Sequence, residues 1–178
     1  MCLSPDHSWY WFFDEKEQRL ALSLGEYVFM SAYTEKQLIP DAFYQQAFTA
    51  EHTEQFYQLQ EQLPQQLQLS QGQLLQLVFN VIAARFMTLP MMPKSWFFET
   101  SNTIVYPRNG RLVSLQNQHQ RGQFLVIEAT EQASLLMLID DLCQLNEQKS
   151  IEQFALIKVM NDRLMPTLVN NSAVVVAA

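Results

Sequence analysis

The chain has 178 residues, of which 48% are hydrophobic and 16% are charged, and its formal net charge is −7. This length suits one medium domain or two small ones with a real hydrophobic core. An acidic chain repels phosphate backbones, so we expect no nucleic-acid partner.

Membrane insertion and disulfide bonding are also not expected. The longest apolar stretch, Leu74–Met87, is interrupted by polar residues and is too short to span a bilayer. The N-terminus, MCLSPDHSWY, lacks the basic and apolar regions of a signal peptide. We therefore expect Cys2 and Cys143 to be free thiols in a reducing cytoplasm.

Residues 8–30 predict a three-stranded antiparallel meander. The stretch SWYWFFD carries aromatic side chains on both faces of a strand, with Trp9 and Trp11 on the same face. In RLALSL, alternate leucines, Leu22 among them, share one face. A strand with apolar residues on both faces must be covered on both, by its own domain or by a partner.

Helices are predicted next. A short segment opens at Pro40 and runs to Phe48, and a helix spans about residues 50–63, where Pro64 is expected to end it. The next helix spans residues 70–87, and its first turn has the Ser70–Gln73 spacing of a capping box. Because this helix is apolar on nearly every side, we expect it to be the buried centre of the first half.

The segment TLPMMPK contains two prolines and no glycine, which is typical of a stiff connector. We place the domain boundary there, with an N-terminal α/β domain over residues 1–92 and a C-terminal domain over 93–170. The uncharged residues 171–178 are expected to form a disordered tail.

The C-terminal half predicts short strands separated by turn signals. Asn109-Gly110 is a typical hairpin turn. This pattern favours a small, twisted, closed or half-closed β-barrel, so the fold class is α+β. Residues 154–166 return to the core as either a strand or a short helix. The predicted strands are 96–99, 103–106, 111–115, 124–129 and 135–139.

No catalytic motif is present. Four glycines leave little material for a phosphate-binding loop, and there is no G-x-S-x-G elbow. His7, His52 and His119 lack metal-ligand spacing. We therefore predict a protein without catalytic residues, metal or cofactor.

The positive charge is unevenly placed. Residues 1–92 hold 4 Lys and Arg against 10 Asp and Glu, whereas residues 93–178 hold 7 against 8. A basic patch on an acidic protein suits docking of an acidic partner. Lys94 is expected at the rim of a pocket or at a strand edge, because lysine at the start of an apolar strand extends toward solvent. Trp96 is expected to be buried in the core.

Four stretches of the sequence, in residues 5–14, 38–43, 92–98 and 157–166, carry a distinctive set of residues. These are Pro5, Asp6, Trp9, Trp11, Asp14, Leu38, Pro40, Asp41, Ala42, Phe43, Met92, Pro93, Lys94, Ser95, Trp96, Phe98, Ile157, Lys158, Met160, Asn161, Asp162, Arg163, Leu164 and Pro166. In these residues and their spacing the sequence resembles the cell division protein ZapC family of gamma-proteobacteria.

This resemblance implies a function that composition cannot give. Proteins of the family are cytoplasmic, act at the mid-cell division ring and are not enzymes. They bind FtsZ, the tubulin-like GTPase of the ring, promote lateral association of its protofilaments and lower its GTPase activity. The implied fold is an N-terminal α/β domain and a C-terminal β-barrel-like domain.

We expect FtsZ, which is acidic as a family, to dock on an apolar floor ringed by basic groups in the C-terminal domain. A second surface on the N-terminal sheet would comprise Trp9, Trp11 and Leu22. The residues predicted for the first surface are Lys94, Trp96, Arg108, Arg121, Lys158, Asn161 and Arg163.

Two alternatives remain from the residues. An apolar barrel with a basic rim could instead bind a fatty acid or an anionic metabolite. The chain could also be a purely structural domain with an obligate partner.

Overall fold

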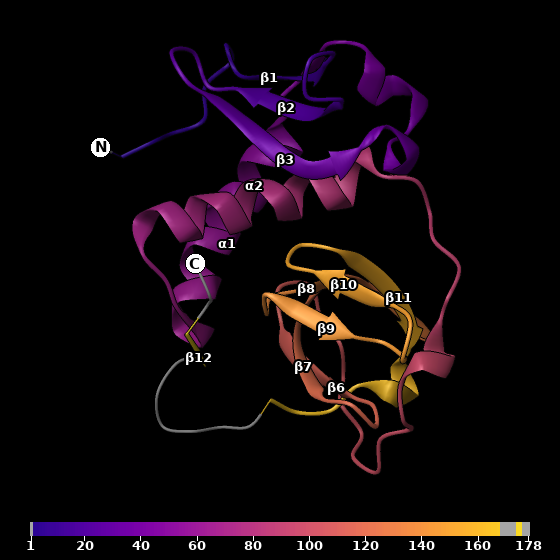
Figure 1. The fold of residues 1–178 in the computed structure, drawn as a ribbon. Coiled ribbons are helices and arrows are strands. Elements are labelled where there is room, and N and C mark those ends of the chain that lie inside the picture. The colour runs from indigo at the N-terminus through magenta and orange to yellow at the C-terminus, as the bar shows by residue number, and fades with distance from the viewer. Residues whose placement is uncertain (1, 168–173, 176–178) are drawn as a thin grey trace. The chain divides into compact units, whose positions relative to one another are not determined.

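The computed structural model describes residues 2–167 and 174–175. Its architecture is α+β, with two α-helices and several antiparallel sheets (Figure 1). The contacts divide the chain into two compact units, each built from two segments. Unit 1 comprises Met1–Glu61 and Leu74–Pro90, and unit 2 comprises Gln62–Gln73 and Met91–Ala178.

Unit 1 contains a four-stranded antiparallel sheet in the order β3-β2-β1-β4. The predicted three-stranded meander is confirmed, because β1 pairs with β2 and β2 with β3. Gly25, with a φ of +88°, forms the tight turn between β2 and β3. The strands are β1 (Tyr10–Asp14), β2 (Arg19–Ser23), β3 (Val28–Thr34) and β4 (Gln46–Ala47).

Both predicted helices are present. Helix α1 spans Ala50–Gln66, so the predicted end at Pro64 is wrong. Proline removes one helical hydrogen bond, but Leu63 and Leu67 are buried on either side of it, and their packing favours continuation. Helix α2 spans Gln71–Met87 and is buried over most of its length, as predicted. Short 3-10 helices η1 (Glu35–Gln37) and η2 (Pro40–Phe43) precede α1.

Two polar contacts fix helix α2. The predicted capping box forms, because Gln73 N donates to Ser70 Oγ at 3.2 Å and Ser70 N donates to Gln73 Oε1 at 2.9 Å. In mid-helix the buried Asn80 accepts a hydrogen bond at Oδ1 from the Ala32 amide of β3, at 2.9 Å. Asn80 therefore links the central helix to the edge strand of its sheet.

Unit 2 contains a four-stranded antiparallel sheet in the order β11-β8-β7-β6 and a two-stranded sheet of β9 and β10. The described strands close no barrel, so the closed form of the predicted barrel-like domain is not present. The two outer strands do not pair with each other: Lys94 N bonds to a carbonyl of β11, and Met165 bridges to Ser114 of β6. The strands are β6 (Leu112–Gln116), β7 (Arg121–Ala129), β8 (Ala133–Leu138), β9 (Leu142–Gln144), β10 (Ser150–Glu152) and β11 (Leu156–Met160).

Three of the five strands predicted for this half correspond to β6, β7 and β8, and two do not form. Residues 96–99 begin with the 3-10 helix η3 (Ser95–Phe97), and residues 103–106 have no ladder partner. Asn109-Gly110 forms a turn, in which Arg111 N donates to the Arg108 carbonyl at 3.1 Å, but the predicted hairpin does not form, because residues 103–106 pair with no strand. Residues 154–166 contain both predicted forms, the strand β11 and the 3-10 helix η4 (Asn161–Arg163).

The segment between the two α-helices belongs to unit 2. Gln66 Nε2 donates to the carbonyl of Gly110 at 2.7 Å, and Gln66 Oε1 accepts from the Leu112 amide at 2.8 Å. Strand β5 (Leu67–Gln68) pairs in parallel with β12 (Val174–Val175). The rest of the predicted disordered tail lies outside the described residues.

Candidate protein-binding surface

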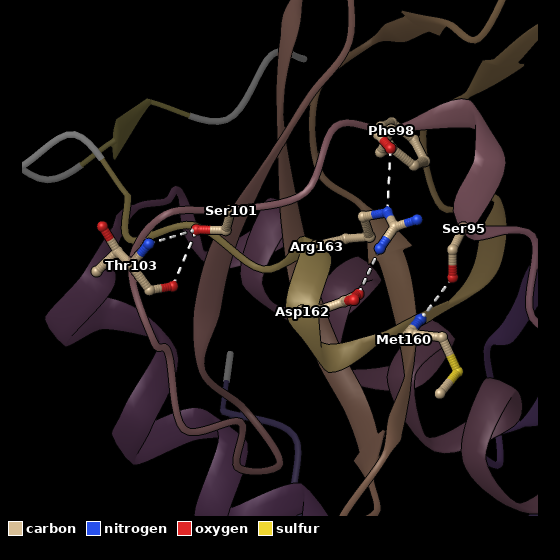
Figure 2. Close-up of polar contacts among 7 residues, drawn as sticks. All are labelled: Ser95, Phe98, Ser101, Thr103, Met160, Asp162 and Arg163. Atoms are coloured by element: carbon tan, nitrogen blue, oxygen red, sulfur yellow. Dashed lines mark hydrogen bonds and ion pairs between the residues drawn. The ribbon is translucent and has the colours of Figure 1, made fainter.

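The start of unit 2 is fixed by hydrogen bonds to β11. Lys94 N donates to the carbonyl of Lys158 at 2.8 Å, and Ser95 Oγ accepts from the Met160 amide at 2.8 Å (Figure 2). Pro93, which lacks an amide hydrogen, precedes this contact. The connector thus ends as a short extension along the outer edge of the sheet.

This anchoring exposes Trp96. In a 3-10 helix, residues three apart lie on the same side, and Ser95 and Phe98 are both buried. Trp96, one position on, faces solvent and is 71% exposed. The prediction that Trp96 is buried in the core is therefore wrong, and Phe98 occupies the core position instead.

Trp96 lies at an open groove of about 520 Å³. Its ring centroid is 5.7 Å from that of Phe97, which packs against the core of unit 2. Lys149 Nζ lies 5.6 Å from the centroid of the Phe97 ring, within cation–π range. We call this feature the Trp96 groove; its lining residues are Trp96, Phe97, Phe98, Glu99, Asn117, Gln118, Leu145 and Asn146.

Lys94 and Lys158 are adjacent through their backbones, and both side chains are half-buried. Ile157 and Val159 point into the core, so Lys158 lies on the outer face of β11. In the part of the chain that the structure describes, neither ammonium group forms an ion pair. Both charges are therefore available to a partner.

Arg163 is engaged within unit 2. Its Nε donates to the carbonyl of Phe98 at 3.1 Å, and its Nη1 lies 2.6 Å from Asp162 Oδ1 (Figure 2). The main chain of Asp162 in turn accepts from the Ser101 amide at 2.7 Å. Arg163 thus fastens η4 to the loop after η3, and its side chain is only 21% exposed.

Asn161 is also used internally. Its Oδ1 accepts from Ser134 Oγ at 2.7 Å, and its Nδ2 donates to the carbonyl of Thr130 at 2.9 Å. These bonds tie η4 to the turn between β7 and β8. One of its two side-chain donors and one of its two acceptor lone pairs are therefore used within unit 2.

The two remaining predicted arginines differ from each other. Arg121 donates through Nη2 to the carbonyl of Pro166, and its Nε is buried without a partner in the described residues. Arg108 is exposed in the loop before β6, with no side-chain contact among the described residues. The structure therefore brings Lys94, Lys158 and Trp96 together, and it does not join Arg108 to them.

The predicted second surface is wrong. Trp9, Trp11 and Leu22 are all buried. The ring of Trp9 contacts Phe56 and Phe79, with centroids 6.0 and 5.8 Å apart, so unit 1 covers this face with its own helices. These residues form core rather than a docking site.

Lys149 and the exposed residues Ile104 and Tyr106 are not predicted from sequence patterns. Lys149 follows a polar turn and gives no pattern of its own. Ile104 and Tyr106 were included in a predicted strand, and only the missing ladder partner shows that they remain exposed.

Among the described residues, burial keeps the Cys143 thiol and the His52 imidazole uncharged at neutral pH. No group of three or more His, Cys, Asp and Glu side chains is placed to hold a metal there. Burial raises the pKa of the Cys143 thiol to about 11, which keeps it protonated and unreactive. Burial lowers the pKa of His52 to about 4, so its imidazole is neutral at neutral pH.

Comparison with known proteins identifies the chain first as a cell-division protein. The family model for the N-terminal part of cell-division protein ZapC matches residues 2–89, and that for the C-terminal part matches residues 90–170. The chain belongs to the ZapC family, which confirms the resemblance found in its sequence. Across the described residues, no helix is long and apolar enough to cross a bilayer.

Similar proteins named cell division protein ZapC occur in several bacteria. The relative from Ferrimonas balearica is 44% identical, covering 93% of each chain. That from Shewanella oneidensis is 41% identical, covering 93% of this chain and 94% of its own. That from Aeromonas hydrophila is 38% identical, again covering 93% of each.

Proposed function

We propose that the chain is a non-enzymatic cell-division factor of the cytoplasm that binds FtsZ directly at the mid-cell ring. In this proposal it promotes lateral association of FtsZ protofilaments and lowers their GTPase activity. Family membership supports the proposal. We also propose that residues 1–92 and 93–170 are its two functional domains.

The observation that carries the binding role is the exposed tryptophan. A large aromatic side chain costs free energy to leave in water, and tryptophans are enriched among the residues that dominate protein–protein binding. Trp96 is held in its exposed position by the buried Ser95 and Phe98 beside it. Because the backbone at Trp96 is already ordered, little further conformational entropy of the backbone is lost when a partner binds there.

Three lysines of unit 2 are suited to an acidic partner. Lys94, Lys149 and Lys158 all belong to unit 2, whereas the chain as a whole is acidic. Such charges raise the association rate and orient the partner more than they add affinity. The Trp96 groove would then provide most of the binding free energy.

Binding to the polymer explains the effect on GTP turnover. A protein that binds assembled filaments but not free subunits shifts the equilibrium toward filaments by mass action. Subunits then exchange more slowly, and GTP hydrolysis falls without contact to the nucleotide. Bundling additionally requires two contacts per molecule or a dimer.

Co-sedimentation with purified FtsZ and GTP tests the proposal, with GTP turnover measured in the same tubes. We expect the protein to pellet with polymer, to increase the pelleted FtsZ and to slow turnover. If it stays in the supernatant and leaves FtsZ unchanged, the proposed function is wrong.

Two variants test the surface. Trp96→Ala should weaken binding about tenfold or more, since central aromatic anchors are worth about 2 kcal/mol. Tyr44→Ala, which removes an exposed aromatic side chain from unit 1, is the matched control and should bind normally. Equal binding by the two variants would exclude the Trp96 groove as the docking site.

A charge-reversal pair tests the lysines. Lys94→Glu combined with Lys158→Glu should slow association, most clearly at low salt. Lys16→Glu combined with Lys36→Glu makes the same charge change on exposed residues of unit 1 and is the control. If both doubles reduce binding equally, only the net charge matters.

The alternative of a small-ligand barrel has lost its structural basis, because the described strands close no barrel. Native mass spectrometry of the purified protein would detect a retained ligand as added mass. We expect the mass of the chain alone.

A further inference from the structure

Residues 103–107, Thr-Ile-Val-Tyr-Pro, have the composition of a strand but lie in no sheet. We call them the 103–107 segment. Its side chains alternate as in a strand: Ile104 and Tyr106 are 80% and 77% exposed, and Val105 between them is buried in the core of unit 2. Pro107 further favours an extended backbone at Tyr106.

The segment is fixed at both ends. Ser101 Oγ donates to the carbonyl of Thr103 at 2.9 Å and accepts from its amide at 3.1 Å (Figure 2). At the other end, Arg111 Nη1 donates to the carbonyl of Tyr106 at 2.8 Å. The buried Val105 holds the middle, so the extended shape is set before any partner binds.

Most main-chain groups of residues 104–106 form no hydrogen bond within the described residues. The amides of Ile104, Val105 and Tyr106 donate to no acceptor within the described residues, and the carbonyls of Ile104 and Val105 accept from no donor there. The two edges of the four-stranded sheet of unit 2 differ from this segment: Lys94 bonds to β11, and Met165 bonds to β6. A strand with a free edge is a template for another extended chain.

The charge next to the segment is positive. Residues 100–111 contain Arg108 and Arg111 and no Asp or Glu, on a chain whose net charge is −7. The side chain of Arg108 is exposed, with no partner among the described residues. A strand that docks here would lie close to positively charged side chains at one end of the segment.

We propose that the 103–107 segment binds an acidic, extended polypeptide segment of another protein by adding it as a strand. Backbone hydrogen bonds to residues 104–106 would give affinity, and apolar side chains of the partner would cover Ile104 and Tyr106. Carboxylates of the partner would pair with Arg108. Because the segment is already extended, little conformational entropy is lost on binding. This site is additional to the Trp96 groove and goes beyond the proposed function.

Selection from a displayed library of random peptides on the full chain tests the proposal. We expect the enriched peptides to be acidic and to alternate apolar with polar residues. Their binding, measured by fluorescence anisotropy, should weaken about tenfold or more in Arg108→Glu and in Ile104→Ser/Tyr106→Ser. Lys36→Glu and Tyr44→Ala, both at exposed positions of unit 1, are the controls, and they should bind the peptides as the unmodified chain does.

Amide hydrogen exchange tests the strand itself. With an enriched peptide bound, the amides on the paired edge, those of either Ile104 and Tyr106 or Val105, should exchange more slowly, because they gain acceptors. The proposal is overturned if the library yields no binder, if the binders ignore Arg108→Glu and the double serine variant, or if exchange in residues 104–106 is unchanged on binding. Circular dichroism of each variant confirms that these exposed positions leave the fold intact.

Discussion

Arg163 lies between a main-chain carbonyl and a carboxylate, and its removal should destabilise unit 2. Arg163→Ala deletes the bond to the Phe98 carbonyl, and we expect a loss of about 1–3 kcal/mol in unfolding free energy. The ion pair with the exposed Asp162 adds little to this figure. Urea unfolding measures the change, and Arg108→Ala, at an exposed arginine, should change it by less than about 0.5 kcal/mol.

The same variant separates a structural role from a binding role. If Arg163→Ala has normal stability but no longer binds FtsZ, Arg163 is a contact residue after all. Arg163→Lys should recover only part of the stability, since one ammonium cannot reproduce the planar fork of the guanidinium.

His52 should make stability depend on pH. Its Nδ1 accepts from Trp11 Nε1 and from the Thr49 amide, both at 3.2 Å, and burial lowers its pKa from 6.5 to about 4. Below pH 6.5 the unfolded chain binds a proton that the folded chain does not, so stability falls as the pH decreases toward 4. Between pH 7 and pH 5 this group alone should cost about 2 kcal/mol.

Urea unfolding of the unmodified chain and of His52→Asn at both pH values checks this expectation. Asparagine can present an acceptor to Trp11 but does not titrate, so the variant should lose about 2 kcal/mol less between pH 7 and pH 5. An identical pH dependence in the two proteins would show that His52 is not the titrating group.

In strand β7, the packing around Gly122 leaves no room for a side chain. A Cβ at Gly122 would lie 2.8 Å from Phe124 Cε2 and 3.3 Å from Cys143 Sγ, closer than van der Waals contact allows. Gly122→Ala should therefore destabilise unit 2 by about 1–3 kcal/mol, as overpacking does elsewhere. Thermal or urea unfolding should show that the double variant Gly122→Ala/Phe124→Leu regains part of the stability that Gly122→Ala loses. If it regains none, a clash with the Phe124 ring is not the cause of the loss.

Gly72 provides the matched control. It lies in the first turn of α2, where an added Cβ has nothing within 4 Å. Gly72→Ala should stabilise the protein by about 0.5–1 kcal/mol, because alanine loses less conformational freedom in a helix. The same substitution thus has opposite signs in the two elements.

At the level of elements, patterns that depend on local spacing predict this fold well. The alternating leucines of β2 and the Ser70–Gln73 capping box are such patterns. The elements that fail depend on distant partners. Residues 96–99 start with a helical turn because Ser95 bonds to Met160, 65 positions away, and no local pattern encodes that bond.

At the candidate site too, local patterns are predicted from the sequence, and contacts with distant residues are not. The sequence identifies the residue types near Lys94 and Lys158, but it does not show which charged side chains form bonds within the protein. Arg163 and Asn161 have partners contributed by residues 98, 130, 134 and 162, so their availability depends on the tertiary fold. The exposure of Trp96 likewise depends on the tertiary fold, because it follows from the burial of Ser95 and Phe98.

At the scale of the whole molecule, one glutamine links distant parts of the chain. Gln66 bonds both the Gly110 carbonyl and the Leu112 amide, 44 and 46 positions away. Gln66→Ala leaves both buried groups unpaired and should destabilise unit 2 by about 1–3 kcal/mol in urea unfolding. Gln62→Ala, at an exposed position on the same helix, should have almost no effect, and equal losses would contradict this role for Gln66.

The two-segment construction of unit 2 also has a consequence for synthesis on the ribosome. Residues 62–73 emerge well before the strands that Gln66 joins, because Gly110 and Leu112 are translated more than 40 positions later. Unit 2 therefore cannot complete its contacts while only the first half of the chain has been made. Its folding depends on loop closure over a long sequence separation, which is slow compared with helix formation. A fragment of residues 93–178 would lack Gln66, so the Gly110 carbonyl and the Leu112 amide would lose their hydrogen-bond partner. The second half of the gene therefore does not encode the whole of unit 2.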